Sequence, residues 1–401
     1  MQKSGKVIVV SQHYPPDHST TATIMAAIAN RVARNNEVLV LSGTPGSASL
    51  NSSGPPRVEE IRNSMPGKAA LFKRATTELL FTVRIFVALL IKLRRDDVAI
   101  TVPAPFMLPY AFAAAARLKR AKAVLIVHDL YPEVLIAAGL LKPASMLAKI
   151  MRGLNGLMFR ALNTVVVIGR DTEQLLSRYG GMMPEKIRFI PNWATLVPGI
   201  RPIRPDNPFR RSHAARFVVG LSGNLGFTHD PAIVFEAARL LQHDPNVHFL
   251  LSGWGVGFDQ LKTMQSDAKL PNVTLVDRVA DDDLDELLST ADVWLIPYRN
   301  NVAGVSVPSR FYNLLAVGRP VILVSEPEAE AALTVTENNL GWVVMPGRPD
   351  QLANTIRTAA SSNVSLMAEN AVAVAGNYSP ERALTSYAML VRELLKNRSS
   401  Q

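Results

Sequence analysis

Residues 217–231 read Phe217-Val218-Val219-Gly220-Leu221-Ser222-Gly223-Asn224-Leu225-Gly226-Phe227-Thr228-His229-Asp230-Pro231, an apolar run that passes through a glycine-rich turn into a helical pattern. A continuous apolar run without alternation is typical of a parallel strand that helices cover on both faces. Strand, glycine-rich turn and helix in that order form the unit from which doubly wound sheets are built. This part of the chain therefore predicts a parallel α/β domain.

A first series of apolar runs and helical patterns precedes this one, so the sequence predicts two such domains. Residues 196–215, with four prolines and four arginines, interrupt the series and are interpreted as an interdomain linker. We expect an α/β fold of two tandem Rossmann-like, doubly wound domains that face a cleft, at 1–195 and 216–378. We also expect a C-terminal helix at 379–401, which can cross back to the first domain. The predicted strands are 6–11, 37–42, 98–102, 123–128, 164–169, 187–191, 217–222, 247–252, 273–276, 293–297, 321–324 and 342–344, and the predicted helices are 20–34, 69–95, 106–119, 142–162, 171–179, 231–242, 256–268, 282–290, 308–317, 328–336, 349–360, 363–375 and 380–396.

The composition excludes several classes of protein. Of 401 residues, 48% are apolar and 19% charged, which suits packed cores and excludes a disordered chain. Cysteine is absent, so disulfides, thiolate metal sites and cysteine nucleophiles are excluded. The first six residues lead straight into the apolar run 7–10, which we interpret as a buried strand and not a secretory signal. Arg84, Lys92 and the prolines within 98–116 interrupt the longest apolar stretches, so no membrane span is predicted and a cytoplasmic protein is expected.

The formal charge of +10 is unevenly distributed along the chain. Residues 1–200 carry +13 and residues 201–401 carry −3, and moving the boundary past the linker and Arg216 gives +17 and −7. A basic first domain indicates an anionic partner. Nucleic acid is not expected, because basic and aromatic residues are not interleaved and no nucleic-acid-binding motif is present.

The predicted helix at 68–95 is strongly apolar and basic. Apolar residues with cations at the margins are typical of a helix that lies in an anionic membrane surface. A domain helix with solvated ends has the same pattern, and this segment alone leaves both interpretations open; the basic domain around it favours membrane contact. Its charged residues are Lys68, Lys73, Arg74, Arg84, Lys92, Arg94 and Arg95 against the single acid Glu78.

Two segments of the second domain have the features of anion sites. Glycines in the turn 222–231 let backbone N–H groups approach an anion, although a tight turn that needs two glycines explains the pattern too. In 303–321, Pro308 marks a helix start that Ser306 or Ser309 can cap. Arg310 in that first turn is disfavoured by the helix dipole, and a phosphate beside it would remove the conflict; a surface arginine is the alternative. Two anion sites together indicate a nucleotide diphosphate.

The acidic run at 281–286 is interpreted as helix capping and not as a metal site. In the first domain, His128 and Asp129 follow the apolar strand residues 123–127, and His13 and Tyr14 follow the first strand. A histidine at the carboxyl end of a strand can hydrogen-bond a sugar hydroxyl or stabilise developing charge. Loop packing is the alternative for either histidine, and their shared location favours a functional role.

Taken together, these segments resemble glycosyltransferase family 4, with the GT-B fold. The resemblance spans nearly the whole chain. Within the family, the chain is similar to bacterial capsule, O-antigen and exopolysaccharide transferases, including the fucosamine-transferase and colanic-acid types. The residues that carry it are His128-Asp129-Leu130-Tyr131-Pro132-Glu133, Pro191-Asn192, Ser222-Gly223-Asn224-Leu225-Gly226, Val307-Pro308-Ser309-Arg310, Ala316-Val317-Gly318-Arg319-Pro320, Ala329-Glu330 and Gly341-Trp342-Val343-Val344-Met345-Pro346-Gly347.

The resemblance implies a metal-independent, retaining glycosyltransferase without a cofactor. It would move a sugar from a nucleotide sugar, with a UDP-sugar expected, to a lipid-linked (polyprenyl pyrophosphate) saccharide in surface polysaccharide biosynthesis, at the inner face of the cell membrane. The donor would bind the second domain and the acceptor the first. His128, beside the transferred sugar, and Arg310, on the leaving diphosphate, would be catalytic. The donor-binding residues would be Gly223, Asn224, Leu225, Gly226, Arg278, Ser306, Val307, Pro308, Ser309, Arg310 and Asn313, and the acceptor side would hold His13, Tyr14 and Asp129.

The sequence also departs from the family pattern. The family often has two glutamates separated by seven residues, where this chain has Val305 and Asn313. It often has a basic residue just after the glycine-rich turn, where this chain has Phe227-Thr228-His229. The first departure leaves the ribose contact and the donor base open. The second leaves Arg310, with Arg319 or Arg278, as the phosphate cation. Nucleotide-sugar epimerisation on the same fold is the alternative activity.

Overall fold

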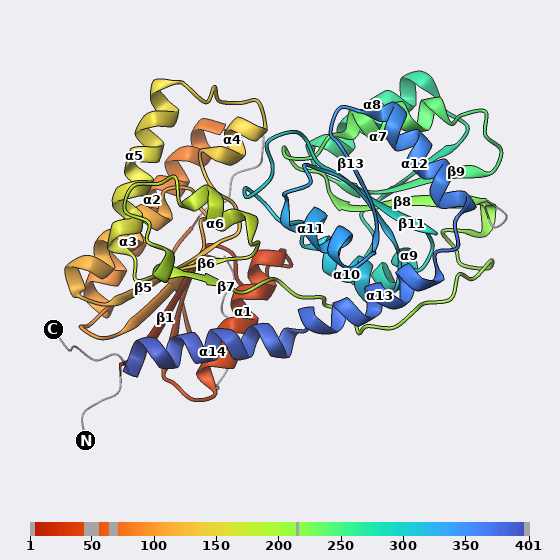
Figure 1. Cartoon of the computed structure of the whole chain (residues 1–401). Helices are drawn as coiled ribbons and strands as arrows, with labels where there is room; N and C mark the ends of the chain where they lie inside the picture. The colour runs from red at the N-terminus through yellow and green to blue at the C-terminus, as the bar shows by residue number, and fades with distance from the viewer. Residues whose placement is uncertain (1–4, 44–55, 64–70, 214–215, 397–401) are drawn as a thin grey trace. The chain divides into compact units, whose positions relative to one another are not determined.

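The computed structural model describes residues 5–43, 56–63, 71–213 and 216–396, with the side chains of one helix described from Thr76 onward (Figure 1). The chain forms two compact units. The first consists of Met1–Pro132, Ala144–Pro191 and Glu381–Gln401, and the second of Glu133–Pro143 and Asn192–Pro380.

The first unit contains a sheet of seven parallel strands in the order β3-β2-β1-β4-β5-β6-β7. The strand order reverses between β1 and β4, which is the topological switch point of a Rossmann-like domain. The five inner strands are buried almost throughout, as expected for parallel strands with helices on both faces, whereas the two edge strands, β3 and β7, are more exposed. The strands are β1 (Val7–Ser11), β2 (Val38–Ser42), β3 (Arg57–Glu60), β4 (Val98–Thr101), β5 (Lys122–Val127), β6 (Thr164–Val167) and β7 (Ile187–Phe189), and the helices are α1 (Thr20–Ala33), α2 (Leu71–Lys92), α3 (Leu108–Lys119), α5 (Met146–Ala161), α6 (Asp171–Leu176) and α14 (Pro380–Lys396).

The second unit contains a sheet of six parallel strands in the order β10-β9-β8-β11-β12-β13, with its switch point between β8 and β11. The two sheets confirm the predicted α/β class with two Rossmann-like domains. The strands are β8 (Phe217–Asn224), β9 (Val247–Trp254), β10 (Val273–Asp277), β11 (Val293–Pro297), β12 (Val321–Val324) and β13 (Gly341–Val344), and the helices are α4 (Glu133–Ala137), α7 (Pro231–Leu240), α8 (Val256–Ala268), α9 (Leu284–Leu288), α10 (Arg310–Ala316), α11 (Glu330–Glu337), α12 (Pro349–Ser361) and α13 (Ser365–Ala375).

Two elements were not predicted from the sequence. Strand β3 pairs with β2 at the edge of the first sheet, and Val58 is its one fully buried residue. A polar edge strand of four residues gives no apolar run to detect. Helix α4 has five residues, which is less than two turns and too short for a helical period to appear in the sequence.

The predicted linker packs along the second unit. Three of its arginines form ion pairs there: Arg201 with Asp285 at 3.0 Å, Arg204 with Glu286 at 2.7 Å and Arg210 with Asp292 at 2.9 Å. These charges therefore belong to the second unit, and the sequence-based split of +17 and −7 assigned them to the wrong domain.

With the structural boundaries, the first unit holds 28 Lys and Arg against 13 Asp and Glu, a formal charge of +15, and the second holds 15 against 20, a formal charge of −5. The charge therefore remains unevenly distributed, with the positive charge concentrated in the first unit. Within the described residues, no helix is both long and apolar enough to cross a membrane.

Candidate functional site

The two segments that the sequence singled out in the second unit lie against each other at its switch point. Gly223 is near the carboxyl end of β8 and adopts a φ of +107°. A Cβ atom on Gly223 would lie 3.3 Å from Cζ of Arg310, the first residue of α10. Arg310 donates through Nη2 to the carbonyl of Asn224, the last residue of β8. Ligands of doubly wound sheets bind at this edge of the sheet.

The Arg310 side chain is half-buried, and the Nη1 atom of its guanidinium is buried without a hydrogen-bond partner. Within the described ranges, no carboxylate forms an ion pair with it. Burial lowers the pKa of Arg310 to about 10, which leaves the group charged at neutral pH. A buried cation is costly unless an anion pairs with it, so the site as folded favours an anionic ligand.

A histidine extends this site on the side of β11. The His229 ring lies 5.0 Å from the ring of Tyr298, the residue after β11, and its Nε2 atom is buried with no partner. Burial, and then the charge of Arg310, hold the pKa of His229 well below its ordinary value. The imidazole is therefore neutral at pH 7, so one ring nitrogen remains for a ligand while Arg310 supplies the charge.

The helix start near Pro308 differs from the prediction. Helix α10 begins at Arg310, and the side chain of Ser309 makes no capping hydrogen bond, so the expected Ser309 cap is wrong. Val307 and Pro308 are buried, whereas Ser306 is half-buried. Because α10 has only seven residues, the arginine and not the helix end is the candidate for anion binding here.

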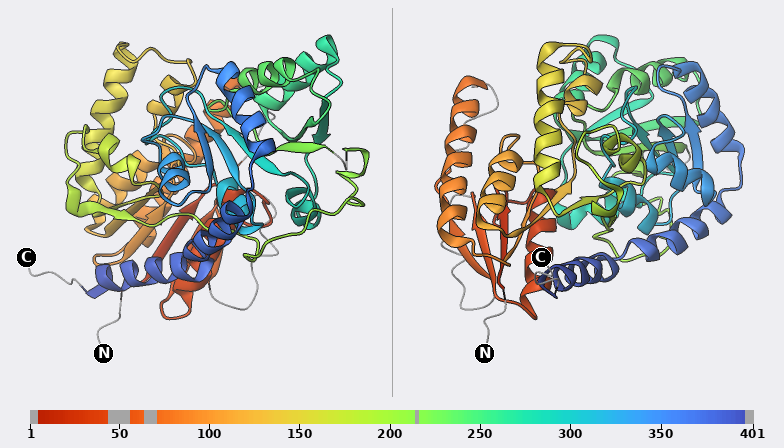
Figure 2. Two further views of the ribbon diagram at one scale, coloured as in Figure 1. Left: turned by 45° about the vertical axis from the view of Figure 1, so that its right-hand side comes forward. Right: turned by 60° about the vertical axis from the view of Figure 1, so that its left-hand side comes forward.

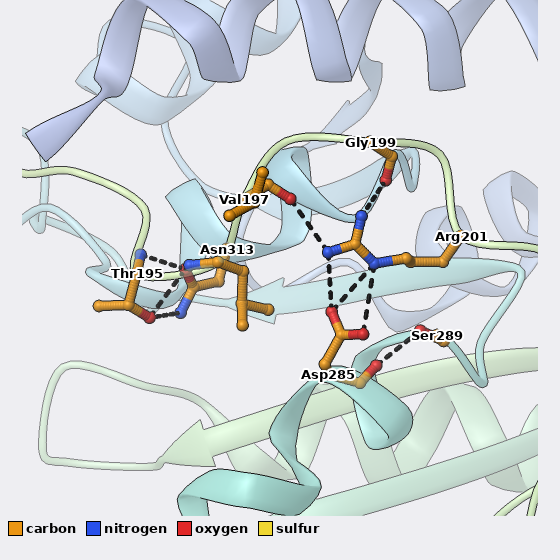
Figure 3. Close-up of polar contacts among 8 residues, drawn as sticks. Thr195, Val197, Gly199, Arg201, Asp285, Ser289 and Asn313 are labelled. Atoms are coloured by element: carbon orange, nitrogen blue, oxygen red, sulfur yellow. Dashed lines mark hydrogen bonds and ion pairs between the residues drawn. The ribbon is translucent and has the colours of Figure 1, made fainter.

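Asn313 is engaged by the segment that opens the second unit (Figure 3). Its Oδ1 atom accepts hydrogen bonds from the backbone N–H groups of Thr195 at 2.7 Å and Leu196 at 3.2 Å, and its Nδ2 atom donates to the Thr195 hydroxyl at 2.9 Å. Both ends of the amide thus have protein partners. The geometry favours a structural role for Asn313 over the predicted donor contact.

Further contacts hold the same segment to the second unit. The N–H of Gly199 donates to the carbonyl of Ala316 at 2.8 Å, and Arg201 donates to the carbonyls of Val197 and Gly199 while it pairs with Asp285 (Figure 3). Residues 195–201 are therefore fixed along α9 and along α10, which is the helix that begins with Arg310.

The other two arginines considered for phosphate binding have protein partners. Arg319 donates to the carbonyls of Ser289 at 2.9 Å, Ala291 at 2.8 Å and Gly318 at 3.4 Å, which makes it a structural residue. Arg278 follows β10, with its guanidinium 4.7 Å from the centre of the Trp254 ring and 3.8 Å from Asp281. Of these three arginines, Arg310 is the one that has a buried nitrogen atom without a hydrogen-bond partner.

The first unit places its predicted residues at the carboxyl edge of its sheet, on β1 and β5, which flank β4. His128 follows β5; its Nε2 atom is buried without a partner, and burial lowers its pKa to about 4. His13 follows β1, with its Nδ1 atom 2.6 Å from Oδ2 of Asp17. Tyr14 is buried, and burial raises its pKa to about 12. Asp129 is half-buried beside His128.

No group of three or more metal-binding side chains occurs among the residues that the structure describes. The acidic run forms a 3₁₀ turn over Asp281–Asp283 and the start of α9, and Asp285 and Glu286 pair with Arg201 and Arg204.

Both halves of the chain match known sequence families. Residues 21–196 match the model for Glycosyltransferase Family 4, and residues 205–375 match the model for Glycosyl transferases group 1. The chain is a glycosyltransferase with a family 4 domain followed by a group 1 domain. The predicted resemblance and the enzyme class are confirmed.

Relatives of this glycosyltransferase are known from two bacteria. It is 26% identical to the Pseudomonas aeruginosa glycosyltransferase WbjE over 98% of each chain. It is also 24% identical, over 74% of each chain, to Escherichia coli WcaI, described as a glycosyl transferase of colanic acid biosynthesis. Neither description supports the epimerase alternative.

Solved structures share the fold of this glycosyltransferase. Anabaena HepE, crystallised with UDP and glucose, has a TM-score of 0.71 at 18% identity, with 97% of this chain and 100% of that chain covered. WaaG, a glycosyltransferase involved in lipopolysaccharide biosynthesis, has a TM-score of 0.62 at 17% identity, with 96% and 99% covered.

Sequence reasoning missed part of the candidate site. His229 and Tyr298 meet only through tertiary structure, because they follow different strands, β8 and β11. Ser325 and Glu326 follow β12 and each has a buried oxygen, Oγ and Oε2, without a partner. A polar residue directly after a buried strand was the available signal, as it was for His13 and His128.

The free energy of unfolding should fall as the pH is lowered from about 6.5 towards 4. His128 and His229 have pKa values below those of the unfolded chain, so the unfolded state takes up more protons in this range. Each contributes up to about 1.4 kcal/mol per pH unit. Urea denaturation at pH 7.0 and 5.0 measures the loss, which should be smaller for His128→Gln. Equal losses in this variant and in the unsubstituted protein would contradict the prediction.

Proposed function

We propose that the protein is a retaining glycosyltransferase that moves a sugar from a UDP-sugar to a lipid-linked saccharide during surface polysaccharide biosynthesis. The relatives support the process, since WcaI is described for colanic acid and WaaG for lipopolysaccharide. HepE structures that contain UDP and UDP-glucose support the donor class. The second domain then binds the donor and the first binds the acceptor.

The observation that carries the proposal is the guanidinium of Arg310 against Gly223 at the switch point, with a buried Nη1 atom and no counter-charge. A nucleoside diphosphate placed there pairs with Arg310, while the glycine leaves room for it to approach the backbone. As the bond to the sugar breaks, negative charge grows on the diphosphate, and Arg310 stabilises it. Transfer without a metal ion follows from this role.

His128 contributes a neutral ring to the proposed reaction. Because its pKa is about 4, it is uncharged at pH 7 and can hydrogen-bond a hydroxyl of the transferred sugar. His13, Tyr14 and Asp129 lie at the same edge of the first sheet and are proposed to face the acceptor. The charge of +15 on this unit suits a pyrophosphate-linked acceptor at the anionic inner face of the cell membrane, with helix α2 as a contact.

A thermal-shift panel of UDP, GDP and ADP tests the proposal. A ligand that binds only the folded state stabilises it by about 2.7 kcal/mol at 100 times its Kd, so UDP should raise Tm more than GDP or ADP. A UDP-sugar that raises Tm and yields no epimer on incubation alone supports transfer. The absence of a shift with all three nucleotides would contradict the nucleotide-sugar assignment.

A further inference from the structure

Helices α2, α3 and α5 form one layer on a single face of the first sheet (Figure 2). Helix α3 packs against both α2 and α5. The inner sides of all three helices contribute to one hydrophobic core, with residues such as Phe81, Phe112 and Phe159. Their outer sides together form a surface that we call the helical layer.

The outer side of α5 is an apolar stripe. Met146, Ile150, Leu154 and Leu157 follow the spacing i, i+4, i+8 and i+11, which places them on one face of the helix. With Leu147, these side chains are between 44% and 71% exposed. The opposite face is buried, so α5 is apolar on both sides and polar only at its margins.

Helix α2 has a similar outer stripe. Leu79, Val83, Val87 and Ile91 recur every four residues, and with Leu80 they are between 48% and 75% exposed. Large apolar side chains exposed singly are common, whereas two stripes on one helical layer, on either side of α3, mark an interaction surface.

The charges of the helical layer identify the kind of partner. The sequences of the three helices contain nine Lys and Arg and a single acid, Glu78. Lys149 and Arg160 are exposed at one margin of the α5 stripe, and Arg84 is exposed on α2. By contrast, α6 and α14, which belong to the same unit, carry four acids against three bases. The three helices thus hold +8 of the unit's formal charge of +15.

We propose that the outer side of the helical layer lies on an anionic lipid bilayer, with the α5 and α2 stripes in the interface and the flanking cations at the phosphate groups. Apolar stripes with cationic margins and almost no acids fit such a surface, and protein interfaces are depleted in lysine. The proposal rests on the lipid-linked acceptor proposed above, and it adds α5, which the sequence did not indicate.

Flotation with vesicles of phosphatidylcholine alone, or with 30% phosphatidylglycerol, tests the surface with the full chain. The unsubstituted protein should bind the anionic vesicles and be released by salt. The variant Ile150→Ser/Leu154→Ser should bind them at least about 10-fold more weakly, because two apolar side chains no longer leave water. Lys149→Gln/Arg160→Gln should lose mainly the preference for anionic over neutral vesicles.

A matched control is Leu366→Ser/Met389→Ser, which removes two exposed apolar side chains from α13 and α14, outside the layer, and should bind like the unsubstituted protein. Equal binding by the α5 variant and this control would overturn the proposal. So would a concentration-dependent dimer that Ile150→Ser/Leu154→Ser dissociates while vesicles do not bind, because the layer would then cover a second copy. The Tm response to UDP is measured in parallel: if it persists without vesicle binding, the surface assignment fails and the nucleotide-sugar assignment does not.

Discussion

Replacing Arg310 with methionine is expected to weaken nucleotide binding by about 100-fold or more and to leave the ligand-free protein at least as stable as before. Removing one partner of a buried charge pair costs about 2–5 kcal/mol of binding, and a factor of 100 corresponds to about 2.7 kcal/mol. Without ligand, the guanidinium is buried with a free Nη1 atom, so its removal relieves an uncompensated charge.

Arg319→Met is the matched control for this experiment. Burial lowers the pKa of Arg319 to about 10, as it does for Arg310, but the Arg319 guanidinium donates to carbonyls of Ser289 and Ala291. Its replacement leaves buried acceptors unpaired and should lower the free energy of unfolding by about 1–3 kcal/mol. Urea denaturation, the Tm response to UDP and sugar transfer are measured for both variants. A loss of stability in Arg310→Met equal to that in Arg319→Met, with the UDP response intact, would refute the proposed role of Arg310.

Gly223→Ala should also abolish most donor binding, and it should destabilise the protein as well. A side chain at a φ of +107° is strained, which costs about 1–3 kcal/mol, and the new Cβ atom would lie 3.3 Å from Arg310 Cζ. The guanidinium must then move away from the turn. Gly226→Ala in the same turn meets only the Asn224 side chain at 3.9 Å, so its Tm should stay near that of the unsubstituted protein.

Thermal denaturation with and without UDP compares these two glycine variants. A Gly223→Ala protein with normal Tm and a normal UDP response would show that neither the backbone conformation nor the position of Arg310 depends on this glycine.

The sequence predicted the sheets well because parallel strands buried on both faces are continuous apolar runs. Strand β11, Val293–Pro297, was predicted with its observed bounds. Strand β3 was missed because edge strands need only one buried side chain, here Val58. In the same way, the paired arginines of 201–210 could not be read from the sequence, since their partners Asp285, Glu286 and Asp292 are about 80 residues away.

The candidate site was predictable only in part. The conflict between Arg310 and the helix dipole pointed to that residue, and the glycine-rich turn to Gly223, but nothing in the sequence showed that the two touch. The role of Arg310 in binding phosphate stays a prediction. The role of Asn313 could not be assigned from the sequence. The family often has a glutamate at this position, whereas the amide of Asn313 accepts hydrogen bonds from the backbone of Thr195 and Leu196.

The contacts of residues 192–213 have a consequence for protein engineering. A separate donor module should begin at residue 192 and not at 216, since the later cut removes Arg210 and leaves the carboxylate of Asp292 without its cation. The module's two ends are neighbours, because the N–H of Ala194 donates to the carbonyl of Tyr378 at 3.1 Å. Adjacent termini permit circular permutation and transplantation, so 192–380, which holds the second unit except for Glu133–Pro143, is a natural cassette for exchange between relatives.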